Sequence, residues 1–139
     1  ERDRRIVSLL PRAEEGAEAA LDAWVEMVAH NQRHPDGVAL YTAMSAAVID
    51  ADHQAHPWFR EHLLGAISYL VDALERGKAM GEVRPGAPSE KIARKLVALS
   101  DGLQVQWLCS RADGGADVDM REVMAGMVAD VKDRWLIRP

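Results

Sequence analysis

Hydrophobic residues recur every three or four positions along most of the chain, a spacing that places them on one face of an α-helix. The alternation of apolar and polar residues that marks a half-buried strand does not extend over any convincing length. Prolines, together with the pair Gly114 and Gly115, divide this helical pattern into segments. The pattern therefore predicts an all-α fold, an antiparallel helical bundle of about six helices.

The prolines and glycines also predict where each helix begins and ends. A short first helix is expected to end near Leu10, because the residue before a proline disfavours helical geometry. The others are expected over about 14–33, about 38–51, Pro57 to about Met80, about Ser89 to Arg111, and about Asp117 to Trp135, with Asp117 as a cap. At 1.5 Å per residue the fourth helix measures about 36 Å, long enough to cross the whole domain.

The fifth expected helix is unusual, because its middle reads SDGLQVQWLCS and places an aspartate, two glutamines and a glycine inside an otherwise apolar segment. At about 100° per residue, one face carries a core stripe of Ile92, Leu96, Leu99, Leu103 and Trp107. A second face carries the smaller residues Ala98, Gly102, Val105 and Cys109, and a third carries Val97, Asp101, Gln104 and Leu108. Small residues let another helix approach closely, so a partner chain is the simplest way to bury the second face.

The last expected helix supports this interpretation, because it ends the chain with a broad, methionine-rich apolar stripe, a type of surface that packs adaptably. The predicted dimer interface consists of Ala98, Gly102, Val105, Gln106, Cys109, Met120, Val123, Met124, Met127, Val128 and Val131. The alternative, in which both helices complete the core of one subunit, stays open. Because a buried amide needs a hydrogen-bond partner, Gln104 and Gln106 are expected to pair across a dimer interface or to face a ligand.

Composition and charge narrow the class of protein. The 139 residues, 48% of them hydrophobic, suffice for one compact domain. The net charge of -5 opposes binding to DNA, which is held chiefly by Lys and Arg. No apolar run approaches the roughly 18 residues of a membrane span, and no signal peptide opens the chain. A single cysteine, Cys109, fits a reducing cytoplasm, and its context WLCSR predicts that it is buried.

Two long runs, LERGKAMGEVRPGAPSEKIARKLVALSDGLQVQWL and the preceding YTAMSAAVIDADHQAHPWFREHL, resemble the C-terminal effector-binding and dimerisation domain of tetracycline-repressor-type (TetR family) transcriptional regulators. The most specific pieces are the long helix ending in GEVRP, the acidic Glu90 a few positions on, and LSDGLQVQWL. The resemblance covers nearly the whole chain. It implies a homodimer in which the last two long helices of each subunit form a four-helix interface.

The family's N-terminal helix-turn-helix domain is missing from this sequence. Residues 1–10 are therefore expected to be the tail of the helix that links to it, and residues 11–139 to be the effector-binding and dimerisation domain. In the intact regulator, two recognition helices would lie in successive major grooves of operator DNA. An effector that favours a different dimer geometry would release that DNA.

The resemblance also implies an effector pocket between the second, third, fourth and fifth helices. Residues that face inward on helical wheels are Trp24, Met27, Val28, Asn31, Leu40, Met44, Leu63, Ile67, Leu70, Leu99 and Leu103. Such mostly apolar walls predict a small apolar or aromatic effector and no cofactor. Asn31 is the one amide among them, and it either contacts the ligand or bonds to a neighbouring helix end. Tyr41 and Tyr69 lie near the edges of the stripes, where they could donate a hydroxyl, but they are expected to point to solvent.

Other chemistry has less support in the sequence. His30 and His34 have the spacing of a metal-binding pair, but no third ligand follows at a recognisable interval. Cys109 lacks a neighbouring base, and phosphate loops, serine elbows and paired carboxylate motifs are missing. We therefore expect no enzyme activity and no metal. The leading hypothesis is a ligand-sensing regulatory domain of a transcriptional repressor. The alternatives are a dimerisation module without an effector and a small helical metal-binding protein.

Overall fold

The computed structural model describes residues 15–114 and 118–138. Within these ranges the regular structure is helical and comprises α2 (Ala17–Gln32), α3 (Pro35–Val48), α4 (His56–Ala79), α5 (Ser89–Ala112) and α6 (Met120–Trp135). Extended pairing among these residues is limited to one isolated bridge between Val83 and Leu136. The all-helical prediction is confirmed, while the expected helix that ends near Leu10 and the expected linking segment lie outside the described residues.

The helix starts show how the sequence sets the boundaries. Proline occupies the first turn of α3 and of α4, where its missing N–H is not needed. Because Pro35 takes this position, α3 begins three residues before the predicted start at Val38. Helix α6 begins at Met120, since the Asp119 side chain accepts a hydrogen bond from the Glu122 backbone N–H at 3.1 Å. The predicted cap, Asp117, lies outside the described residues.

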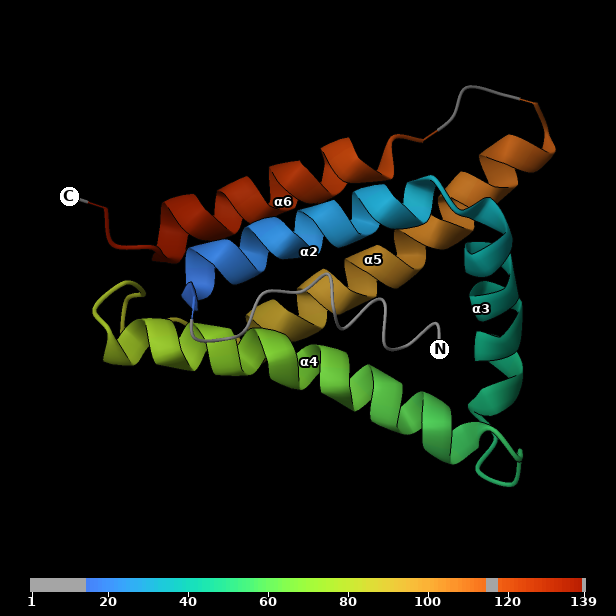
Figure 1. Ribbon diagram of the computed structural model, residues 1–139, viewed down its shortest axis with the longest axis horizontal. Helices are drawn as coiled ribbons and strands as arrows, with labels where there is room; N and C mark the ends of the chain where they lie inside the picture. Colours follow the sequence, from blue (N-terminus) through green and yellow to red (C-terminus); the bar gives the residue numbers. More distant parts are fainter. Residues whose placement is uncertain (1–14, 115–117, 139) are drawn as a thin grey trace.

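The five helices form an elongated molecule (Figure 1). Helices α2 and α6 lie side by side along its length, and α4 and α5 form the second closely packed pair. Helix α3 stands across one end and joins α2 to α4. Helix α5 contacts α3, α4 and α6, and α2 contacts the same three helices.

The core lies between these helices and is built from large apolar side chains, among them Leu21, Leu70, Leu96, Trp107 and Met124. Each stabilises the fold by about 1.5–3 kcal/mol through burial. Polar side-chain atoms in this core form hydrogen bonds. The Trp24 indole N–H donates to the Ser100 hydroxyl at 3.0 Å, and that hydroxyl donates to the Leu96 carbonyl at 3.0 Å. This chain fixes α2 against α5.

The turn between α4 and α5 holds three chain segments together through Glu82. Helix α2 lacks a side-chain cap of its own at Gly16. The Glu82 carboxylate instead accepts from the backbone N–H groups of Ala17 at 2.9 Å and Glu18 at 2.8 Å. The Glu82 carbonyl also accepts from the Ile137 N–H at 2.8 Å. A negative charge at a helix N-terminus is favourable, so one residue fixes the ends of both α2 and α6.

Replacing Glu82 tests this capping. Glu82→Ala leaves two N-terminal amides of α2 without their acceptor, so we expect the free energy of unfolding to fall by about 1–2 kcal/mol. Chemical denaturation measures the change. The matched control is Glu90→Ala, because Glu90 also lies in a helical first turn but forms an exposed pair with Arg94, worth about 0.3–0.5 kcal/mol. Equal losses in the two variants would contradict the assigned role.

Candidate functional site

Polar side chains from α3 and α5 meet around a cavity of about 260 Å³. Its wall comprises Tyr41, Thr42, Ser45, Asp101, Gly102, Gln104 and Val105. The α5 residues come from the stretch SDGLQVQ, whose aspartate and glutamine are unusual in the middle of a packed helix. We call this space the α3–α5 cavity.

Gln104 is held on the cavity wall by α3. Its side chain is buried, with 9% of the residue surface exposed. The Thr42 hydroxyl donates to the Gln104 amide oxygen at 3.5 Å, and the Ser45 hydroxyl donates to the Thr42 carbonyl at 2.7 Å. The amide thus has a partner within its own subunit, as burial requires. Gln106, by contrast, is exposed on the outer side of α5.

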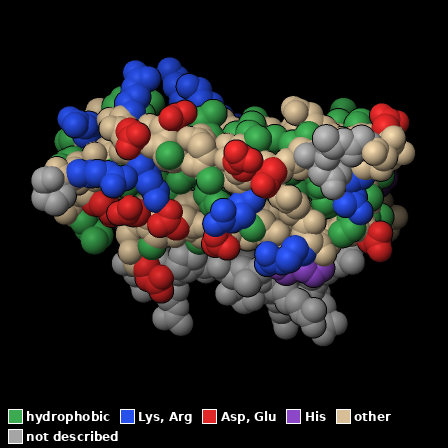
Figure 2. Space-filling model, turned by 90° about the horizontal axis from the view of Figure 1, so that it is seen from above, with side chains coloured by type: hydrophobic (Ala, Val, Ile, Leu, Met, Phe, Trp, Pro, Cys, Tyr) green, Lys and Arg blue, Asp and Glu red, His purple; other side chains and the backbone are tan. Residues whose placement is uncertain are grey.

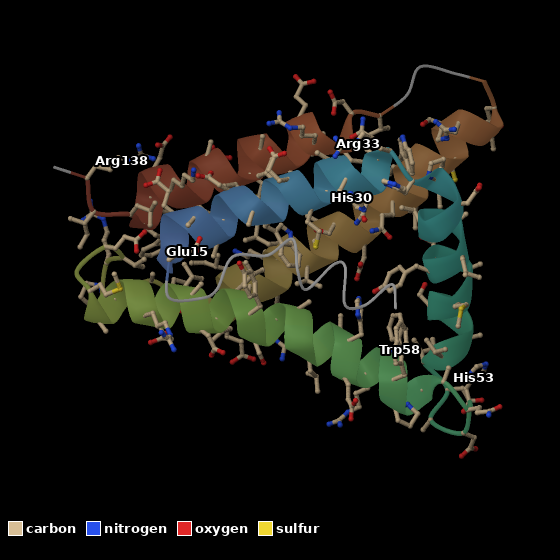
Figure 3. All side chains as sticks on the ribbon, in the orientation of Figure 1. Glu15, His30, Arg33, His53, Trp58 and Arg138 are labelled. Atoms are coloured by element: carbon tan, nitrogen blue, oxygen red, sulfur yellow. The ribbon has the colours of Figure 1, made fainter. Side chains whose placement is uncertain are left out.

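An aromatic cluster of Tyr41, Trp58, Phe59 and His62 lies beside the cavity, and Tyr41 belongs to both. The Tyr41 ring centroid is 5.5 Å from that of Phe59 and 5.6 Å from that of His62. The rings of Trp58 and His62 are stacked at 5.3 Å. Figure 3 shows Trp58 projecting from the first turn of α4 into the angle between α3 and α4.

Tyrosine exposure is one correction to the sequence interpretation. Tyr41 and Tyr69 are half-buried and do not simply point to solvent. Tyr41 packs on Phe59, and Tyr69 packs against the core, because both phenol rings lie on the sides of their helices that face neighbouring helices. Burial raises the pKa of the Tyr69 hydroxyl to about 12. Both hydroxyls therefore stay protonated in neutral solution.

Asp101 carries the charge of this site. Burial raises the pKa of its carboxyl group, and the opposing influence of His62 is smaller. Burial also raises the pKa of the Tyr41 hydroxyl, with a further contribution from the negative charge of Asp101. The carboxyl, the phenol and the imidazole thus interact electrostatically. A half-buried carboxylate is unfavourable for folding, and such groups are often found in binding or catalytic sites.

The predicted effector-binding residues are distributed between the core and the surface of the described chain. Trp24, Val28, Ile67, Leu70 and Leu103 lie in the packed core, and Met27, Leu63 and Leu99 pack against it. Asn31 is half-buried, while Leu40 and Met44 are 54% and 38% exposed. Of this set, Ile67 lines a described cavity, a separate groove of about 250 Å³ between α4 and α5.

Some of the predicted dimer-interface residues are exposed, and others are buried inside the subunit. On α5, Ala98, Gly102, Val105, Gln106 and Cys109 are all exposed, and we call these five residues the outer α5 face. On α6, Val123 is exposed, Met127 and Val131 are half-buried, and Met120, Met124 and Val128 are buried in the core. Cys109, which its sequence context predicted to be buried, is exposed in the structure of the single chain.

The two histidines that have the spacing of a metal-binding pair contact each other. The rings of His30 and His34 are stacked with centroids 4.2 Å apart, and His34 Nδ1 lies 2.8 Å from the His30 carbonyl oxygen. Burial lowers the pKa of His30, with smaller contributions from His34 and Arg33. In the described ranges, His, Cys, Asp and Glu side chains do not gather in groups of three or more that could hold a metal ion. None of the described helices has the length and apolarity needed to cross a membrane.

Sequence reasoning did not assign the α3–α5 cavity, although it noted the polar third face of α5 that contains Asp101 and Gln104. The missing information was which helix covers that face, and periodicity does not supply it. Comparisons with protein-family models, curated proteins and solved structures gave no match.

The substitution Asp101→Asn tests the electrostatic account. Because the folded-state pKa of Asp101 is raised, the folded state binds this proton more tightly than the unfolded state does. The fold consequently loses stability as the pH rises from the unfolded pKa through the folded one, whereas asparagine does not titrate. We expect the variant to melt higher than the wild type at about pH 7, with a difference that narrows as the pH falls toward about 4. A destabilised variant at neutral pH would contradict the account.

Proposed function

We propose that the chain is the ligand-sensing, homodimerising regulatory domain of a TetR-type transcriptional regulator, acting as a repressor. The observation that carries the proposal is the outer α5 face, whose five residues are all exposed in the described part of the chain, four of them small or apolar. Val105 is 49% exposed on this face, and Val123 on α6 is 43% exposed. Exposed apolar rows of this kind favour association with another protein surface.

Two glycines support close helix packing at this surface. An added Cβ atom would meet nothing within 4 Å at Gly102 on α5 or at Gly126 on α6. Both positions leave the helix backbone open to an approaching helix, and such close approach is the usual consequence of small residues at helix crossings. A second copy of the chain presents the same row, as a two-fold symmetric interface requires.

The α3–α5 cavity supplies a route from ligand to dimer. Gly102 and Val105 belong both to the cavity wall and to the outer α5 face. A ligand in the cavity therefore touches the helix that would form the dimer contact. A ligand that binds one arrangement of the two subunits better than another shifts the population between them, and so changes the spacing of the attached DNA-reading domains.

The charge distribution supports a regulatory domain that does not itself bind DNA. The net charge is -5. Figure 2, which looks onto the face above α6, shows Lys and Arg interspersed with Asp and Glu over this face. A basic patch would be needed to neutralise phosphates there. Operator binding is accordingly assigned to the N-terminal domain that the resemblance implies.

The packed interior favours a second candidate, a dimerisation module without a small-molecule effector. Several residues expected to line a pocket, including Trp24 and Leu70, are part of the core. The two candidates differ in ligand response. A ligand at a hundredfold excess over its dissociation constant stabilises its protein by about 2.7 kcal/mol, so a thermal-shift screen distinguishes them. If the chain is a dimer and no ligand in the screen raises its melting temperature, the second candidate is favoured.

Gly102→Leu tests the dimer. A Cβ atom added at Gly102 has nothing within 4 Å, so the backbone accepts a side chain there, but a leucine would hold two outer α5 faces apart. We expect light scattering to give twice the 15.3 kDa chain mass for the wild type and the monomer mass for the variant. Gly65→Leu is the matched control, since Gly65 is also an exposed helical glycine with nothing within 4 Å. A dimer that survives Gly102→Leu would place the contact elsewhere.

A further inference from the structure

We propose that the α3–α5 cavity binds an organic cation, an alkylated ammonium group held between the Asp101 carboxylate and the ring of Tyr41. This inference rests on the proposed sensing function and names the chemical class of its ligand. It differs from the apolar or aromatic effector that the sequence suggests, because the wall of this cavity is charged and polar.

The charge of the cavity wall is negative, and His62 of α4 offsets it only in part. Asp101 is the one charged residue among the seven that line the cavity, and the other six carry hydroxyl, amide or apolar groups. Within residues 15–114 and 118–138, no salt bridge joins Asp101 to another side chain. His62 of α4 and Tyr41 of α3 are the titratable groups that influence it. A bound cation would supply the opposite charge that a half-buried carboxylate needs.

The aromatic cluster adds a second attraction for the same charge. The face of an aromatic ring attracts cations electrostatically, by about 0.5–2 kcal/mol, and rings combined with carboxylates are a recurrent solution for alkylated ammonium groups. Tyr41 is part of the cavity wall, and its ring is kept in place by Phe59 at 5.5 Å and His62 at 5.6 Å. The ring therefore does not have to be ordered when a ligand binds.

Cavity size and the remaining polar groups restrict the ligand further. A volume of about 260 Å³ is slightly below the usual range of ligand pockets, about 300–1,000 Å³, so only a small ligand fits. Thr42, Ser45 and Gln104 place hydroxyl and amide groups on the wall that can bond to a hydroxyl of the ligand. A small hydroxylated alkylammonium ion such as choline fits these features, and a neutral ligand of equal shape would leave the Asp101 charge unpaired.

Isothermal titration of the chain with choline chloride tests the inference. The comparison ligand is the neutral isostere in which a tert-butyl group replaces trimethylammonium, used at equal ionic strength. We expect choline to bind at least about tenfold more tightly than this alcohol, since pairing the charge and the ring contact together contribute more than about 1.4 kcal/mol. Equal affinities, or no binding of choline at all, would overturn the inference.

The matched variants are Asp101→Asn and Asp72→Asn. Both remove one carboxylate from a cavity wall, but Asp72 lies in the separate groove between α4 and α5. We expect Asp101→Asn to weaken choline binding by about tenfold or more and Asp72→Asn to leave it unchanged. Circular dichroism on both variants confirms that they are folded. Undiminished choline binding in Asp101→Asn would contradict the assigned site.

Light scattering on the same samples separates this inference from the proposed function. Choline binding to a monomer would support the site and refute the dimeric sensor. A dimer that does not bind choline but is stabilised by an uncharged aromatic ligand would support the proposed sensor and refute the alkylammonium ligand. Binding of choline to a dimer supports both the dimeric sensor and the proposed cation site.

Discussion

Helix α5 is packed against α3, α4 and α6 at once, and this constraint determines where its polar residues can go. Ser100 is accommodated by the indole of Trp24, and Gln104 by the hydroxyl of Thr42. Asp101 lies between the packed side and the outer side, and among the described residues His62 of α4 interacts with it electrostatically but forms no salt bridge with it. The α3–α5 cavity and the outer α5 face both follow from this arrangement.

The sequence was sufficient to predict that the fold is helical and where most helices lie, because proline, glycine and the 3.6-residue period act locally. It was not sufficient to assign partners to helix faces. Met120, Met124 and Val128 belong to the stripe assigned to a dimer, yet they complete the core because α6 packs on α2. Leu40 and Met44 were assigned to a pocket, yet α3 stands across one end of the molecule and leaves them exposed.

The candidate site also could not be predicted in full from the sequence, for the same reason. Asp101 and Gln104 were recognised as anomalous for a helix of this composition, but their surroundings depend on α3 and α4, which lie far away in sequence. Tyr41 and Thr42 lie beside Asp101 and Gln104, α5 residues about 60 positions away, through tertiary packing. Such contacts leave no periodic signal. The sequence does show that a charged residue, Asp101, lies within a helix that is otherwise largely apolar. This unusual combination indicates where the site is.

The central claim is that a second copy of the chain covers the outer α5 face, and Cys109 offers the most direct test. It is the one cysteine in the sequence and lies exposed on that face within a subunit. The measurement is the rate at which a maleimide bearing a bulky polymer alkylates Cys109 over a range of protein concentrations. The account predicts slow alkylation at high concentration, where the dimer covers the thiol, and fast alkylation on dilution. A fast rate at every concentration would contradict it.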